Sequence, residues 1–127
     1  PKLEDLRLAI VDNPGWEAIV EVKGHDKRSL SLGLISQARR HRDRYREESG
    51  RWPDKVLFVH NSQAALPPDA RHAPFHTSPA DIAELETDGF WIVVPTMDLF
   101  RLYRDRESLG DEARMRLIQT NGVFKYP

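Results

Sequence analysis

A turn signal between two strand-like segments near the N-terminus constrains the fold more than any other feature. Residues 6–11 are apolar except for Arg7, and in residues 16–23 apolar and charged side chains alternate near the end. Between them stands Asp12-Asn13-Pro14-Gly15, where proline fixes φ and glycine tolerates positive φ. Because this chemistry reverses the chain between two strands, the sequence predicts a β-hairpin with its turn centred near Asn13 and Pro14.

Helical and strand-like segments alternate after the hairpin. A stripe at helical spacing predicts a helix over 31–48 that ends at a glycine cap, Gly50; its members are Leu30, Leu34, Ala38, His41 and Tyr45. Continuous apolar runs predict buried strands over 55–60 and 90–94. Further helices are expected over 78–89, 96–106 and 111–120, with a short strand over 123–126. This order predicts an α/β (α+β) fold with a central mixed β-sheet, opened by the hairpin and flanked by helices.

Length and composition limit the classes to which the chain can belong. At 127 residues, the chain makes a single domain over 1–127 with one core. No apolar run approaches the ~18 residues of a membrane helix, so no membrane partner is expected. The chain has no cysteine, which excludes a disulfide framework and a thiolate zinc site and favours a reducing cytoplasm. A first residue other than Met, followed closely by a strand, suggests a domain excised from a longer protein.

The formal net charge of −1 conceals an uneven distribution of charge. Residues 27–51 contain eight basic and three acidic side chains, a net charge of +5, which leaves −6 for the rest of the chain. Within this segment the expected helix carries Arg39, Arg40, Arg42, Arg44 and Arg46. A polyanion responds to a local patch rather than to the mean charge, so these arginines are candidates for phosphate contact with a nucleic acid. A merely solvated helix face is the alternative.

An acid-x-lysine triplet on the second hairpin strand carries the most chemistry. The two-residue period of a strand places the side chains of Glu21 and Lys23 on one face. The expected register pairs Glu21 with residue 6 or 7, which brings an upstream acid, Asp5, close to Lys23. A surface salt bridge between Glu21 and Lys23 is the alternative interpretation.

Two converging carboxylates at this point would bind a hard divalent cation, Mg²⁺ or Mn²⁺. The main-chain carbonyl of Val22 offers a further oxygen ligand. A bound cation lowers the pKa of a coordinated water and neutralises phosphoryl charge, while a neighbouring lysine stabilises the charge that develops during attack. The pattern therefore favours hydrolysis of a phosphodiester.

The segment from Asp5 through Glu21-Val22-Lys23-Gly24 to the following helix and the strand over 56–60 resembles the PD-(D/E)xK superfamily of restriction-endonuclease-like nucleases. The resemblance covers residues 3–61. It implies a core of a helix, three antiparallel-leaning strands, a helix and a strand, and divalent-metal-dependent cleavage of DNA. It also implies metal ligands at Asp5 and Glu21, a catalytic lysine at Lys23 and a site glutamine at Gln37, for which a helix-surface amide is the alternative. The sequence departs from the family pattern at residue 4, a glutamate in place of proline, and in lacking the helix expected before the first strand.

The sequence therefore predicts a Mg²⁺- or Mn²⁺-dependent nuclease domain that acts on DNA. The expected partners are DNA and the other domains of a longer chain, and a homodimer is left open. Two other functions are also left open. One is a catalytically degenerate nuclease-fold module that binds nucleic acid or protein, and the other is an enzyme of another kind that uses the proline-containing segment 67–74 as a lid.

Overall fold

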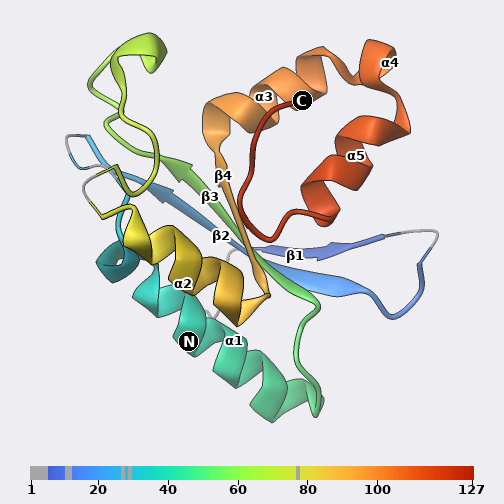
Figure 1. Ribbon diagram of the computed structural model, residues 1–127. Helices are drawn as coiled ribbons and strands as arrows, with labels where there is room; N and C mark the ends of the chain where they lie inside the picture. The colour runs from blue at the N-terminus through green and yellow to red at the C-terminus, as the bar shows by residue number, and fades with distance from the viewer. Residues whose placement is uncertain (1–5, 11–12, 27, 29, 77) are drawn as a thin grey trace.

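A five-stranded mixed β-sheet runs through the centre of the molecule (Figure 1). The computed structural model describes residues 6–10, 13–26, 28, 30–76 and 78–127. The strands, which lie side by side in sequence order, are β1 (Leu6–Ala9), β2 (Glu17–Gly24), β3 (Lys55–Asn61), β4 (Trp91–Pro95) and β5 (Gly122–Val123). β1 and β2 are antiparallel, whereas each later strand is parallel to the one before it. The predicted hairpin and the mixed sheet are thus confirmed.

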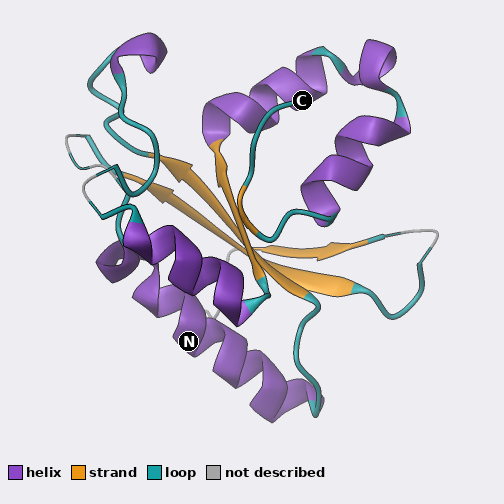
Figure 2. Ribbon diagram, in the orientation of Figure 1, coloured by secondary structure: helices purple, strands orange, loops and turns teal. Residues whose placement is uncertain are grey.

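Helices cover both faces of the sheet (Figure 2). They are α1 (Leu32–Ser49), α2 (Ala80–Asp88), α3 (Thr96–Arg104), α4 (Arg106–Leu109) and α5 (Asp111–Ile118), with a short 3₁₀ helix over Pro68–Ala70. α1 and α2 lie against one face, and α3 and α5 lie against the other. The predicted α/β architecture with flanking helices is therefore confirmed. Among the helices of the described part of the chain, none combines the length and the apolar character that a bilayer crossing requires.

Two apolar layers hold the helices on the sheet. Successive side chains of a strand face opposite sides, so Val56 and Phe58 pack toward α1 while Leu57 and Val59 pack toward α3. Parallel strands with helices on both faces bury both sets of side chains, which explains why β3 and β4 are unbroken apolar runs in the sequence. A polar side chain that is buried on this sheet therefore stands out as a candidate for function.

The register of the hairpin differs from the predicted one. Leu6 lies opposite Val20, the residue before Glu21, whereas residue 6 or 7 was expected opposite Glu21 itself. The Asn13 amide donates to the carbonyl of residue 10, and the Asn13 carbonyl accepts from the amide of residue 16. The observed pairing centres the hairpin on Asn13 rather than between Asn13 and Pro14.

The helix expected over 96–106 is divided at Asp105. α3 ends one residue before Asp105, and α4 begins one residue after it. The Asp105 carboxylate accepts a hydrogen bond from Arg104 Nε at 2.8 Å and another from the Tyr126 hydroxyl near the C-terminus. The hydrogen bonds from Arg104 and Tyr126 lower the pKa of Asp105 to about 2. The break therefore coincides with the point where the C-terminal segment is attached to the helical layer.

Candidate functional site

Glu21 lies on β2, on the face of the sheet that α1 covers, and its side chain is only 3% exposed. A buried carboxylate is unfavourable unless it has hydrogen-bond partners. One of its oxygens, Oε1, contacts Nδ1 of His41 on α1. Since the carboxylate is enclosed between the sheet and the helix, a solvent-facing salt bridge does not describe its position.

Lys23 follows Glu21 on the same face of β2, nearer the end of the strand. Its Nζ donates a hydrogen bond of 3.2 Å to Oε1 of Gln37 on α1. The lysine is half-buried and the glutamine is exposed, so the amine lies where the space between β2 and α1 opens to solvent. The structure thus brings together three of the predicted site residues, Glu21, Lys23 and Gln37.

The spacing of polar residues in β2 and α1 explains why these side chains meet. On α1 they recur every four residues, which places them on one helix face, and on β2 they occupy odd-numbered positions, which places them on one strand face. The resulting contacts, here called the β2–α1 ladder, are Glu17 with Tyr45, Glu21 with His41 and Lys23 with Gln37. Because α1 runs antiparallel to β2, the ladder extends from Glu17 at the start of the strand, through the buried Glu21, to Lys23 near the other end.

Three of the five arginines of α1 are held by contacts within the protein. Arg39 forms an ion pair of 2.7 Å with Asp88 of α2. Arg42 and Arg46 stack on the ring of Trp52, with guanidinium carbons 3.9 and 4.5 Å from the ring centroid. Burial lowers the pKa of Arg42. These three arginines therefore help to attach α1 to its neighbours.

Arg40 and Arg44 are the arginines of α1 that are exposed and for which the structure gives no such intramolecular role. They follow Gln37 and His41 at a spacing of three residues, so they lie on the same side of the helix as the ladder. Arg40 lies nearly one turn, and Arg44 about two turns, along the helix from Gln37, the residue that contacts Lys23. A polyanion bound along this side of α1 would therefore meet both arginines.

The oxygen donors of the site suit a hard cation. Mg²⁺ binds proteins through one or two carboxylates and keeps several of its waters, and Glu21 supplies one such carboxylate. Asp5, the predicted second ligand, lies outside the described residues. Among the residues that are described, no group of three or more His, Cys, Asp or Glu side chains is placed to hold a metal ion. The side chain of Val22 is half-exposed and lies on the opposite face of β2. The predicted ligand at this residue is the main-chain carbonyl, not the side chain.

Two histidines of the site were missed as functional residues. In the sequence, His41 belongs to the apolar stripe of its helix, and this pattern predicts a place in the core. Its spacing of four residues from Gln37 was the available signal, because it places both side chains opposite the acid-x-lysine strand. The other histidine, His60, is the β3 residue paired with Lys23 in the sheet. Nothing in the sequence separates His60 from the buried run that it ends.

Comparison of the chain with protein-family models, with curated proteins and with solved structures finds no match. The contacts between β2 and α1 therefore carry the functional interpretation by themselves.

Proposed function

We propose that the chain is a metal-dependent nuclease domain of restriction-endonuclease-like fold that hydrolyses phosphodiester bonds of DNA. One observation carries the proposal. Glu21 is a buried carboxylate two residues before Lys23 on the same face of β2, and Nζ of Lys23 lies 3.2 Å from Oε1 of Gln37 on α1. A carboxylate and an amine at such a site suit the metal-assisted attack of water on a phosphate.

The order of the elements supports the same fold. The β1–β2 hairpin, the crossover helix α1 and the parallel strand β3 follow one another as the resemblance to the PD-(D/E)xK superfamily implies. The resemblance implies three antiparallel-leaning strands, whereas the described sheet has one antiparallel pair. The likeness therefore rests on β2, α1 and β3, which are the elements that form the site.

Each side chain has its own task in the proposed reaction. Glu21, together with Asp5 and the carbonyl of Val22, would hold Mg²⁺ or Mn²⁺. The cation supplies an acidified water and neutralises charge on the phosphate. Lys23 stabilises the negative charge that develops on the phosphate oxygens, and its hydrogen bond to Gln37 orients the amine. Lys23 therefore acts on the substrate, and Gln37 acts through Lys23.

DNA is the proposed substrate because the cationic side chains beside the site are suited to a phosphate backbone. Arg40 and Arg44 are exposed on the side of α1 that carries the ladder. Each cation that contacts a phosphate releases condensed counterions, so such contacts add affinity that does not depend on sequence.

Cleavage of DNA by the Lys23→Ala variant tests the proposal. We expect the rate in Mg²⁺ or Mn²⁺ to fall by roughly 100-fold or more, because the variant lacks the group that stabilises the developing charge. Rates are measured on a labelled oligonucleotide, and circular dichroism melting verifies that the variant is folded.

A matched control is Lys125→Ala, which removes an exposed lysine from the C-terminal segment. This variant should cleave at the wild-type rate. Full activity of Lys23→Ala, or equal loss in both variants, would overturn the assignment of Lys23.

One contact favours the alternative of a catalytically degenerate nuclease-fold module that binds nucleic acid or protein. Oε1 of Glu21 faces the ring of His41, so one carboxylate oxygen is already engaged. Calorimetric titration with Mn²⁺ separates the two functions. Binding at millimolar metal that is lost in Glu21→Gln supports the nuclease, whereas no binding by the wild-type protein supports the module.

A further inference from the structure

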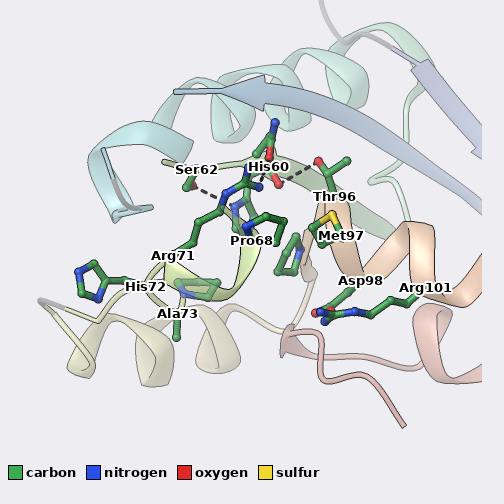
Figure 3. A pocket seen from close by; sticks show the side chains of 13 residues that line it. His60, Ser62, Pro68, Arg71, His72, Ala73, Thr96, Met97, Asp98 and Arg101 are labelled. Atoms are coloured by element: carbon green, nitrogen blue, oxygen red, sulfur yellow. Dashed lines mark hydrogen bonds and ion pairs between the residues drawn. The ribbon is translucent and has the colours of Figure 1, made fainter. Parts of the chain in front are cut away.

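A pocket of about 320 Å³ lies at the carboxyl ends of β3 and β4, beneath the segment that connects β3 to α2 (Figure 3). We call it the β3–β4 pocket; its lining includes His60, Ser62, Arg71, Met97, Asp98 and Arg101, with prolines at 68, 74 and 95. Its volume is at the lower end of the ~300–1,000 Å³ typical of small-molecule sites. The segment above it, residues 67–74, contains the prolines and is the segment for which a lid is one expectation from the sequence.

His60 is the unusual residue of this pocket. Its side chain is buried, and Nδ1 lies 3.0 Å from the Ser62 hydroxyl. The other ring nitrogen, Nε2, is buried and has no hydrogen-bond partner among the described residues. Such a nitrogen is rare in folded proteins because burial without a partner is unfavourable. The position is explained if a ligand in the pocket supplies the missing partner.

The chemistry of the lining favours a neutral, planar ligand over an anion. Burial lowers the pKa of His60 to about 4, so the ring is neutral at physiological pH and offers hydrogen bonds rather than charge. Arg101 is paired with Asp98 at 2.9 Å, and Arg71 donates to Asn61 Oδ1 at 2.7 Å and to main-chain carbonyls. The charge of Arg101 is thus balanced by Asp98, whose carboxylate would repel a phosphate, and the N–H groups of Arg71 already donate to neutral acceptors.

A nucleobase has the properties that this lining accepts. Its flat faces suit the apolar walls formed by the prolines and Met97. Its ring nitrogens and amino groups can bond to Nε2 of His60 and to the Asp98 carboxylate, an acceptor that proteins use for the amino groups of bases. Both polar groups line the same pocket, where Figure 3 shows His60 close to Ser62 and Arg71 and shows Asp98 with Arg101 on α3.

The pocket adjoins the proposed cleavage site. His60 is paired with Lys23 across β2 and β3, and neighbouring strands lie about 4.8 Å apart. His60, which lines the pocket, and Lys23 are thus held on adjacent strands at the same level of the sheet. A nucleotide next to the phosphate at Lys23 would therefore lie close to the pocket.

We infer that the β3–β4 pocket binds the base of an unpaired nucleotide adjacent to the phosphodiester that is cleaved. The inference rests on the proposed nuclease function and specifies its substrate as single-stranded or locally opened DNA. A base that is stacked and paired in a duplex cannot enter such a pocket unless it is first extruded.

Methionine methyl groups provide a direct test. The chain has two methionines; Met97 lines the pocket, whereas Met115 lies on α5. In protein labelled with ¹³C at the methionine methyls, titration with the four nucleosides should shift the Met97 signal saturably and leave Met115 unchanged. Inorganic phosphate should leave both signals unchanged.

The His60→Leu variant tests the role of the unpaired nitrogen. We expect its nucleoside dissociation constant to rise at least ~10-fold, the effect of one buried hydrogen bond, while its melting temperature shows that it remains folded. Three results would overturn the inference: no saturable Met97 shift at millimolar nucleoside, a shift produced by phosphate alone, or unchanged binding by His60→Leu.

The same measurement separates the pocket from the nuclease, because nucleoside binding requires neither cation nor Lys23. If Lys23→Ala cleaves DNA normally while nucleosides still shift Met97, the nuclease assignment fails and the nucleobase pocket stands without it. If cleavage depends on Lys23 but nucleosides do not bind, the pocket fails and the nuclease stands. Once cleavage is established, an abasic site next to the cleaved bond should raise KM for the wild-type protein and not for His60→Leu; equal KM for intact and abasic strands would refute the placement.

Discussion

The β2–α1 ladder and the β3–β4 pocket lie on neighbouring strands and differ in how their buried polar groups are satisfied. In the ladder, Glu21 contacts His41 and Lys23 donates to Gln37. In the pocket, one nitrogen of His60 is buried without a partner among the described residues. A partnered buried group stabilises a fold, whereas an unpartnered one lowers its stability. The comparison indicates that the fold itself accounts for the ladder, while the pocket has a cost that a bound ligand would offset.

The largest expected difference between the two regions is in acid sensitivity. Burial lowers the pKa of His60 from 6.5 to about 4 in the folded protein. Between these values the unfolded chain binds a proton at His60 and the folded chain does not, so acidification favours unfolding. The contribution of His60 to the free energy of unfolding should fall by about 3 kcal/mol as the pH decreases from 6.5 to 4, and should be constant above 6.5. Urea titrations at a series of pH values measure it.

The His60→Leu variant isolates this effect. The charged and titratable groups that line the same pocket, Arg71, His72, Asp98 and Arg101, are unchanged in it. The variant should therefore lose less stability than the wild-type protein between pH 6.5 and 4. If the free energies of unfolding of the wild-type protein and of His60→Leu change in parallel with pH, His60 takes up its proton in the folded protein as it does in the unfolded chain. The contrast with the ladder then disappears.

The next largest effect is expected at His41, on the ladder side of the comparison. His41→Leu removes the ring that contacts the buried Glu21 carboxylate and should lower the free energy of unfolding by about 2 kcal/mol. Chemical denaturation at pH 7.5 measures the loss. His41→Gln, which retains a hydrogen-bonding group, should recover part of the stability. A loss equal to that of His41→Leu would show that packing rather than the polar contact matters.

A smaller effect on stability is expected at the end of the ladder where Tyr45 contacts Glu17. The Tyr45 hydroxyl donates a hydrogen bond of 2.6 Å to Glu17, and burial, together with this bond, raises the pKa of Tyr45. Tyr45→Phe removes the bond but keeps the ring in the core, so it should cost about 1 kcal/mol. Thermal melting measures this change, and DNA cleavage should be unaffected because Tyr45 lies away from Lys23. A selective loss of cleavage would instead extend the catalytic role along the whole ladder.

How well each region can be predicted from the sequence depends on whether the interactions that form it join residues that are near or far apart along the chain. The hairpin, the long helix and the apolar strands depend on local periodicity and turn chemistry, and they were predicted. Local spacing also placed Glu21 and Lys23 on one face of their strand, whereas Gln37 was expected at the site only from the resemblance to the PD-(D/E)xK superfamily. The predicted register of the hairpin was wrong because the pairing is centred on Asn13, and turn residues alone do not fix which residue of a loop lies at its centre.

The pocket could not be predicted because it depends on contacts between distant segments. His60 ends an apolar run, and its environment is set by the connection to α2 and by the first turn of α3. The Thr96 hydroxyl donates to the His60 carbonyl at 3.0 Å across a separation of 36 residues. No periodicity signals such a contact. The sequence suggested a covering role for segment 67–74 only through its length and its prolines.

The smallest expected effect on stability is that of His60→Leu. It gives the sharpest comparison, because histidine is replaced by leucine both in the pocket and, in His41→Leu, in the ladder. At pH 7.5, His60→Leu should change the free energy of unfolding by less than about 1 kcal/mol, or increase it, since an apolar side chain replaces a buried nitrogen that has no partner. His41→Leu, in contrast, removes a partnered group. Denaturation of the two variants under identical conditions compares them directly. If both lose the same stability, the buried nitrogen of His60 is satisfied in solution, and the reason for expecting a ligand in the pocket disappears. If only His41→Leu is destabilised, His60 is maintained at that position for something other than stability.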